Sequence, residues 1–134
     1  MVYLTNQKLI KTMKKILFVE DEPTLQKALK EVLEKEGYNV LPASNGEEGL
    51  SSAKEQKPNL ILLDLILPKM DGFEVLKNLK ADNECKDIPV IVLTNLEGSS
   101  DVGRAIELGA TTYLVKAQYS LEEVTKKIKE VIGE

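Results

Sequence analysis

Short apolar runs alternate along the chain with segments whose apolar residues recur every three or four positions. The runs have the length of β-strands, and the segments have the spacing of helices that bury one face. The pattern predicts strands at residues 16–19, 38–41, 60–63, 90–93 and 112–115. It predicts helices at residues 25–36, 46–56, 72–79, 99–108 and 121–131. Each strand is followed by a helix.

Several residues mark where these helices end or begin. Gly37 and Gly109 follow the last apolar positions of two helices, where glycine commonly ends a helix. Ser120 and Glu123 have the spacing of a capping box, in which each side chain bonds the backbone amide of the other residue. We therefore expect the last helix to begin directly after Ser120.

Strands that alternate with helices indicate an α/β fold with a parallel sheet covered on both faces. The runs at 16–19, 60–63 and 90–93 are apolar throughout, as central strands are, whereas those at 38–41 and 112–115 are mixed, as edge strands can be. The pattern predicts a doubly wound, flavodoxin-like sheet of five parallel strands in the order 2-1-3-4-5. Such folds place their ligands where the chain reverses between the first and third strands, at the carboxyl ends of those strands.

Acidic residues stand at those two strand ends. Glu20 and Asp21 follow the first strand, and Asp64 follows the third. Carboxylates in one place repel one another unless a cation lies among them or some are protonated, and Mg²⁺ favours oxygen ligands. We therefore predict a magnesium site here. Glu22 has another interpretation, because an acidic residue before Pro23 suits the N-cap of a helix.

Two further polar residues end the fourth and fifth strands. Thr94 follows residues 90–93 and Lys116 follows residues 112–115, so the fold would bring a hydroxyl and an ammonium group to the same edge of the sheet. Each alone has an ordinary explanation, as a turn hydroxyl or as a lysine in water. Together with the carboxylates they form one constellation.

Composition narrows the functions that are open to the chain. A net charge of −4 over 134 residues gives no support for direct binding of nucleic acid. The chain has no histidine and one cysteine, Cys85, which excludes an imidazole base, the usual zinc sites and an internal disulfide. Its apolar runs are too short for membrane insertion, and the first runs into acidic residues, unlike a secretory signal. We expect a cytoplasmic protein.

Residues 14–132 resemble the receiver domain of two-component response regulators. The resemblance rests on the acidic pair in LFVEDE, the aspartate in LILLDLILPKMDG, the threonine in VIVLTN, and YLVK, in which an aromatic residue stands three positions before the lysine. It implies a receiver domain over residues 14–134. Residues 1–13, which show no clear periodicity, are predicted to be an N-terminal extension, with Met13 as an alternative start.

The resemblance also implies a mechanism. Asp64 would attack the phosphorus atom of a partner's phosphohistidine. Mg²⁺ would be held by Glu20, Asp21, Asp64 and the backbone carbonyl of Ile66. Lys116 would neutralise charge on the oxygens of the phosphoryl group as it is transferred. This makes the domain a phosphoacceptor in a phosphorelay, and not an enzyme in the usual sense, since it catalyses only its own phosphorylation and slow dephosphorylation.

A switch and its partners follow from the same resemblance. Thr94 would donate its hydroxyl to a phosphoryl oxygen, and Tyr113 would turn into the space that Thr94 leaves. This would change the surface of the fourth helix, fifth strand and fifth helix. The phosphodonor would be a sensor histidine kinase or a histidine phosphotransfer protein, and a downstream effector protein would bind the changed surface. The domain either acts alone or belongs to a longer regulator.

Departures from the family pattern leave an alternative open. Receivers typically follow the lysine with a cis-proline, whereas Lys116 precedes Ala117; a cis bond there costs about 2.5–4 kcal/mol, so we predict a trans bond. Asn95 replaces a small residue. Ile66 and Leu96 are apolar where a polar group would orient water, which predicts slow loss of the phosphoryl group. The alternative is a degenerate receiver that binds a protein partner without phosphorylation.

Overall fold

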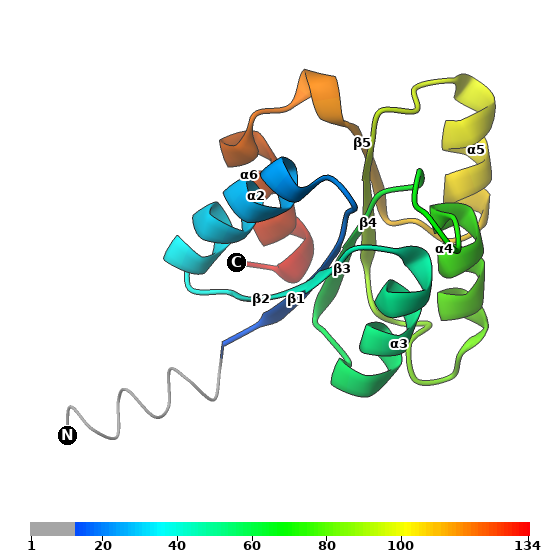
Figure 1. Cartoon of the computed structure of the whole chain (residues 1–134), viewed down its shortest axis with the longest axis horizontal. Helices are drawn as coiled ribbons and strands as arrows, with labels where there is room; N and C mark the ends of the chain where they lie inside the picture. The colour runs from blue at the N-terminus through cyan, green and yellow to red at the C-terminus, as the bar shows by residue number, and fades with distance from the viewer. Residues whose placement is uncertain (1–12) are drawn as a thin grey trace.

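The computed structural model describes residues 13–134, which form one parallel sheet with helices on both faces (Figure 1). The strands are β1 (Lys15–Val19), β2 (Asn39–Ala43), β3 (Leu60–Leu63), β4 (Val90–Thr94) and β5 (Thr112–Val115). The helices are α2 (Pro23–Lys35), α3 (Gly46–Gln56), α4 (Gly72–Ala81), α5 (Ser99–Glu107) and α6 (Leu121–Ile132), with a 3-10 turn, η1 (Lys116–Gln118), after β5. The strands lie in the order β2-β1-β3-β4-β5, which confirms the predicted fold and strand order. The predicted extension lies almost wholly outside the described residues and stays a prediction.

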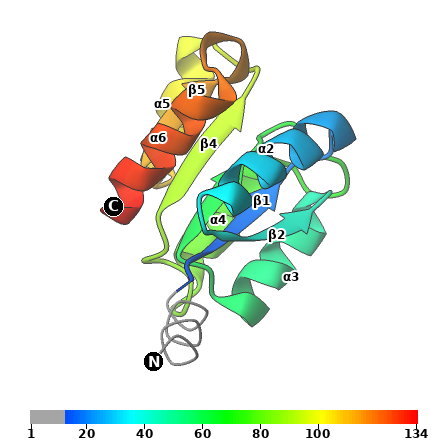
Figure 2. The same cartoon turned by 90° about the vertical axis from the view of Figure 1, so that its left-hand side faces the viewer.

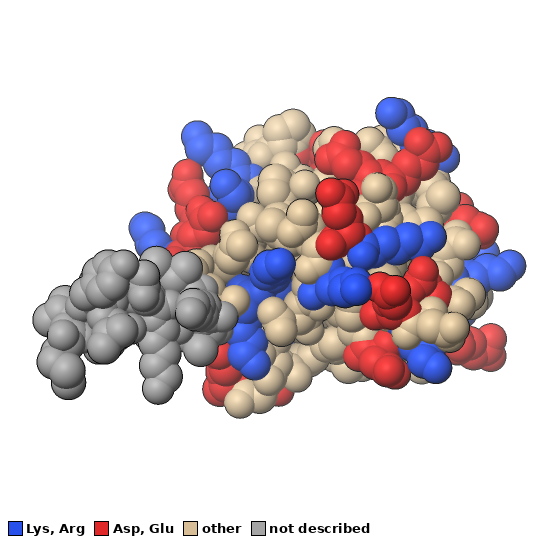
Figure 3. Space-filling view, turned by 90° about the horizontal axis from the view of Figure 1, so that it is seen from below, with Lys and Arg blue, Asp and Glu red and all other residues tan. Residues whose placement is uncertain are grey.

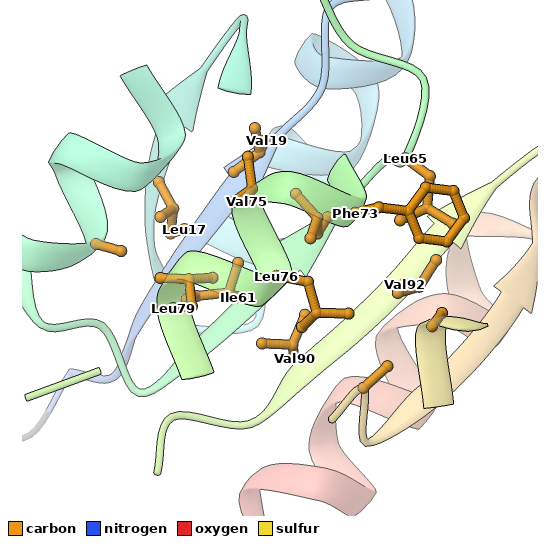
Figure 4. Packing of buried hydrophobic residues seen from close by; sticks show 14 of the residues in the cluster. Leu17, Val19, Ile61, Leu65, Phe73, Val75, Leu76, Leu79, Val90 and Val92 are labelled. Atoms are coloured by element: carbon orange, nitrogen blue, oxygen red, sulfur yellow. The ribbon is translucent and has the colours of Figure 1, made fainter. Parts of the chain in front are cut away.

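The central strands are apolar throughout because both of their faces are covered. Side chains alternate along β1, so that Leu17 and Val19 join one apolar cluster while Ile16 and Phe18 join the other. The first cluster lies between the sheet and α3, α4 and α5 (Figure 4). The second lies under α2 and α6, which cover the face turned toward the viewer in Figure 2. Residues 16 to 19 are all completely buried.

The predicted end of β2 is wrong by two residues. Pro42 was expected to follow the strand, yet it lies inside β2 and pairs in register with Phe18 of β1. Proline is tolerated there because β2 is an edge strand, and one of its sides has no neighbour that needs an amide donor. The mixture of exposed and buried residues in β2 is typical of an edge strand.

The predicted helix ends are confirmed. Gly37 and Gly109 both have positive φ, 94° and 106°, the left-handed conformation in which glycine carries no steric penalty. At the start of α6 the Ser120 hydroxyl accepts from the Glu123 amide, and the Glu123 carboxylate accepts from the Ser120 amide, so the capping box is complete. These local signals fix where α2 and α5 end and where α6 begins.

The helices, the surface and the interior of the fold add three observations. No helix within the described residues is both long and apolar enough to cross a membrane. The face seen in Figure 3 carries basic and acidic side chains side by side. Cys85 is completely buried in the segment between α4 and β4, and burial raises the pKa of its thiol, which makes the thiol unreactive.

Candidate functional site

Strand register brings the predicted site residues to one edge of the sheet. Val19 of β1 pairs with Leu63 of β3, so the residues that follow them, Glu20 and Asp64, leave adjacent strands at the same level. The amide of Asp64 donates to the carbonyl of Val19 at 3.1 Å, which extends the ladder by one bond. The central position of β1 and β3 explains why the two carboxylates that follow them are buried.

The three predicted acidic ligands form one cluster. Glu20 and Asp64 are 1% and 3% exposed, whereas Asp21 is exposed to solvent. One carboxylate oxygen from each residue lies within 4.8 Å of the others. Two buried acids and one exposed acid therefore face a common point that solvent can reach through Asp21.

Lys116 completes this cluster from the end of β5. Its Nζ donates a hydrogen bond to Asp64 Oδ2 at 2.9 Å and lies 2.9 Å from Glu20 Oε1. The described residues contain no cis peptide bond, which confirms the predicted trans bond between Lys116 and Ala117. The ammonium nevertheless reaches both acids, since the chain turns into η1 directly at Lys116.

The charges of the cluster are coupled. Burial raises the pKa of the Glu20 carboxyl, and the ammonium of Lys116 offsets part of this shift. Burial alone would lower the pKa of Lys116, but its hydrogen bonds and ion pairs with Asp64 and Glu20 raise that pKa overall. The lysine is therefore held in its charged form, and two buried acids share one half-buried cation.

The donor atoms fit a hard divalent cation. Glu20 Oε2 accepts from the amide of Glu22 at 3.1 Å, and buried Glu20 Oε1 is contacted by Lys116 Nζ at 2.9 Å. Three carboxylates face this one ammonium group, so the cluster keeps a surplus of acidic groups that a cation coordinated by oxygen would offset. The acidic cluster therefore suits a divalent metal ion.

Two predictions about individual residues near the cluster have different outcomes. Glu22 occupies the N-cap of α2 with Pro23 at the first helical position, as predicted, but its side chain makes no capping hydrogen bond. Its carboxylate lies 3.8 Å from Lys116 Nζ. The amide of Ile66 donates to Asp64 Oδ1 at 3.2 Å, while its carbonyl as a metal ligand stays a prediction.

Thr94 and Tyr113 lie next to the carboxylates and are linked through one loop. Thr94 is completely buried at the end of β4, and its hydroxyl oxygen accepts from the amide of Leu96 at 3.5 Å. The Tyr113 hydroxyl donates to the carbonyl of Leu96 at 2.7 Å, and burial raises its pKa. Thr94 and Tyr113 therefore both form hydrogen bonds with the backbone of Leu96 in the β4–α5 loop.

Sequence reasoning missed two residues that hold this site in place. Gly72 begins α4 so close to β3 that a Cβ atom there would overlap with the carbonyl oxygen of Asp64 and lie 2.5 Å from Leu65 Cα. The side-chain amide of Gln26 donates to the carbonyl of Glu20 at 2.9 Å. The glycine after Asp71 was a visible signal for a close approach, whereas nothing in the helical pattern distinguished Gln26.

Comparisons with known proteins agree with this geometry. The chain is 41% identical over 119 residues to the alkaline phosphatase synthesis transcriptional regulatory protein PhoP of Bacillus subtilis. The aligned region covers 89% of this chain and 48% of PhoP. It is 38% identical over 104 residues to PilH of Pseudomonas aeruginosa, and the aligned region covers 78% of this chain and 86% of PilH. The chain thus spans about half the length of the transcriptional regulators it matches.

A solved structure has the same fold and holds a metal ion. It is the receiver domain of a sensor histidine kinase from Pseudomonas aeruginosa, with a magnesium ion coordinated in its active site cleft. It matches with a TM-score of 0.83 at 28% identity and covers 92% of this chain and 100% of that one. The response regulator receiver domain family matches residues 16–129. The chain therefore belongs to the response regulator receiver domain family of two-component systems.

Proposed function

We propose that this receiver domain accepts a phosphoryl group at Asp64 from a partner's phosphohistidine in a Mg²⁺-dependent step. The observation that carries the proposal is the position of Lys116 Nζ, 2.9 Å from both Asp64 and Glu20, at a cluster of three carboxylates. A cation that contacts the nucleophile also lies close to the oxygens of an incoming phosphoryl group.

The proposed step forms one bond and breaks one. A carboxylate oxygen of Asp64 attacks phosphorus, and the bond between phosphorus and the partner's imidazole nitrogen breaks. The imidazole keeps the electron pair and takes a proton from solvent, and the product on this chain is an aspartyl phosphate. Lys116 stays protonated, because its pKa is raised, and its ammonium donates to the phosphoryl oxygens.

Glu20, Asp21 and Asp64 would hold Mg²⁺, together with the backbone carbonyl of Ile66. When bound, the ion supplies positive charge that offsets the charge on the phosphoryl oxygens. The carboxylate oxygens of the three acids, which lie within 4.8 Å of one another, support this assignment. So does the magnesium ion in the similar receiver domain from Pseudomonas aeruginosa.

The proposed output is a change in the face formed by α5, β5 and α6. Thr94 would donate to a phosphoryl oxygen, and Tyr113, whose hydroxyl already bonds the Leu96 carbonyl, would follow the loop inward. A sensor histidine kinase or histidine phosphotransfer protein would supply the phosphoryl group, and an effector protein, not nucleic acid, would bind the changed face. The exchange would take place in the cytoplasm.

The domain would act only on itself and would lose the phosphoryl group slowly. Ile66, with 54% of its side chain exposed, stands two residues after Asp64 and offers no polar group to orient a water molecule. Leu96, which is half-buried, stands two residues after Thr94 and offers none either. Substitution of Ile66 by asparagine is expected to shorten the lifetime of the aspartyl phosphate.

Incubation with Mg²⁺ and acetyl phosphate, followed by intact-protein mass spectrometry, tests the proposal. The unaltered protein should gain the mass of one phosphoryl group, and Asp64→Asn should gain none. Asp87→Asn is the matched control, since Asp87 is an exposed aspartate in the loop before β4, and it should be labelled like the unaltered protein. Absence of labelling in the unaltered protein would favour the degenerate receiver, which binds its partner without phosphorylation.

A further inference from the structure

The side chain of Gln26, on the first turn of α2, ties together the ends of two strands. Its Nε2 donates to the carbonyl of Glu20 at 2.9 Å and to the carbonyl of Ala43 at 3.1 Å. The Ala43 carbonyl also accepts from the amide of Glu20 at 2.9 Å. One carboxamide group therefore connects α2 with the carboxyl ends of both β1 and β2.

The carbonyl that Gln26 holds has a particular place in the acidic pair. It belongs to the planar peptide unit that joins Glu20 to Asp21. Because that unit is rigid, a hydrogen bond to its oxygen fixes the orientation of the backbone between the Cα atoms of Glu20 and Asp21. The two acidic side chains start from these Cα atoms. The amide nitrogen of Glu20 is held at the same time by Ala43, so both peptide units that flank Glu20 are tied to the end of β2.

Asp21 depends most on this backbone bond. Its side chain is exposed, and none of the hydrogen bonds and ion pairs found among the described residues involves its carboxylate. Glu20, in contrast, has its carboxylate held by the Glu22 amide and by the charge of Lys116. The position of the Asp21 oxygen relative to the other two acids therefore rests on its main chain.

We propose that Gln26 is a positioning residue for the divalent cation site, acting through the peptide unit between Glu20 and Asp21. The inference rests on the proposed function only in assigning these two acids to the cation. Residues that orient metal ligands from outside the coordination sphere typically change metal affinity by about 10- to 100-fold when they are removed. Loss of the Gln26 amide should therefore weaken cation binding without removing any ligand.

The test is direct binding of Mg²⁺ or Mn²⁺ to the full chain, measured by calorimetry without a phosphodonor. Gln26→Met keeps the length of the side chain but removes both hydrogen bonds. The dissociation constant of the metal ion from this variant should exceed that of the unaltered protein by about 10-fold or more. Gln56→Met is the matched control. Gln56 is exposed at the end of α3, so the same substitution there should leave the affinity unchanged. An unchanged affinity in Gln26→Met would overturn the inference.

A second readout separates positioning from a loss of structure. If Gln26 acts only on the cation site, Gln26→Met should accept phosphate to the same final extent as the unaltered protein once Mg²⁺ is raised to saturation. In the unaltered protein, the side-chain amide signals of Gln26 in NMR spectra should exchange slowly with water and shift on addition of Mg²⁺. If they exchange as fast as those of exposed Gln118 and do not shift, the inference is wrong, whatever the folding of the variant.

The outcomes also distinguish this inference from the proposed function. If the unaltered protein binds the cation but does not accept phosphate, the phosphoacceptor role fails while the role of Gln26 in cation binding is still decided by the variants. If the unaltered protein binds no cation at all, the metal site and the role of Gln26 both fail.

Discussion

At the scale of single residues, the distinctive feature is that two buried carboxylates share one lysine. Asp64 and Glu20 each lie 2.9 Å from Lys116 Nζ. Ion pairs on the surface contribute little to stability, but removal of one partner from a buried pair leaves an uncompensated charge and is costly. Lys116 therefore has a structural role in the metal-free protein that is separate from any role in phosphoryl transfer.

This arrangement predicts how stability responds to Lys116→Met. At pH 7 the variant should lose about 3 kcal/mol of unfolding free energy, because both acids are left buried without a cation. The difference in unfolding free energy between the variant and the unaltered protein should become smaller as the pH falls toward 5. Burial raises the pKa of Glu20 above its ordinary value, so the folded variant takes up protons before the unfolded chain does, and stability rises as the pH falls.

Urea unfolding at the two pH values would measure this. Lys127→Met serves as the control, because the Lys127 side chain is 42% exposed and its ion pair with Glu130, at 3.7 Å, lies on the surface. A deficit of the same size at both pH values would contradict the prediction, since it would mean that the cost does not come from buried carboxylates.

At the scale of elements, the start of α4 is set by its contact with the end of β3. Gly72 packs against the backbone of Asp64 and Leu65, and the Gly72 amide donates to the Leu65 carbonyl at 2.9 Å. Asp71 caps the helix by accepting from the Glu74 amide. The helix therefore supports the peptide units next to the Asp64 carboxylate.

Two glycine substitutions should have opposite effects. Gly72→Ala should lower the unfolding free energy by about 2 kcal/mol or more, because the added methyl group meets main-chain atoms that cannot move independently. Gly103→Ala, in the middle of α5, should raise it by about 0.5–1 kcal/mol, because nothing lies within 4 Å of the added group and alanine favours the helix. Thermal or urea unfolding of both variants checks this pair, and equal effects would contradict it.

Local sequence patterns were sufficient for most elements and for most ends of the strands. Continuous apolar runs identified the central strands, and the rule that parallel strands end at one edge predicted that Glu20, Asp64 and Lys116 lie together. The end of β2 was missed because proline ends a central strand but not an edge strand. The part played by Gln26 could not be predicted, since it depends on which main-chain carbonyls the fold brings within its reach.

At the scale of the whole molecule, the family match and the sheet both begin after residue 13. The match covers residues 16–129, and β1 begins at Lys15. A chain that starts at Met13 is therefore expected to fold with the same stability as the full chain and to be labelled at Asp64 to the same extent. Urea unfolding and labelling with acetyl phosphate would check both parts. A shortened chain that is labelled poorly would show that the domain extends further toward the N-terminus than predicted.

The proline in β2 has a consequence for how whole molecules meet. A sheet edge offers unpaired amides and carbonyls to which another chain can add a strand, the usual first step of aggregation. Pro42 is exposed on such an edge and has no amide hydrogen to offer. An incoming strand would find no amide donor at the fourth residue of the five-residue β2, so this edge is a poor template for the addition of a strand from another molecule.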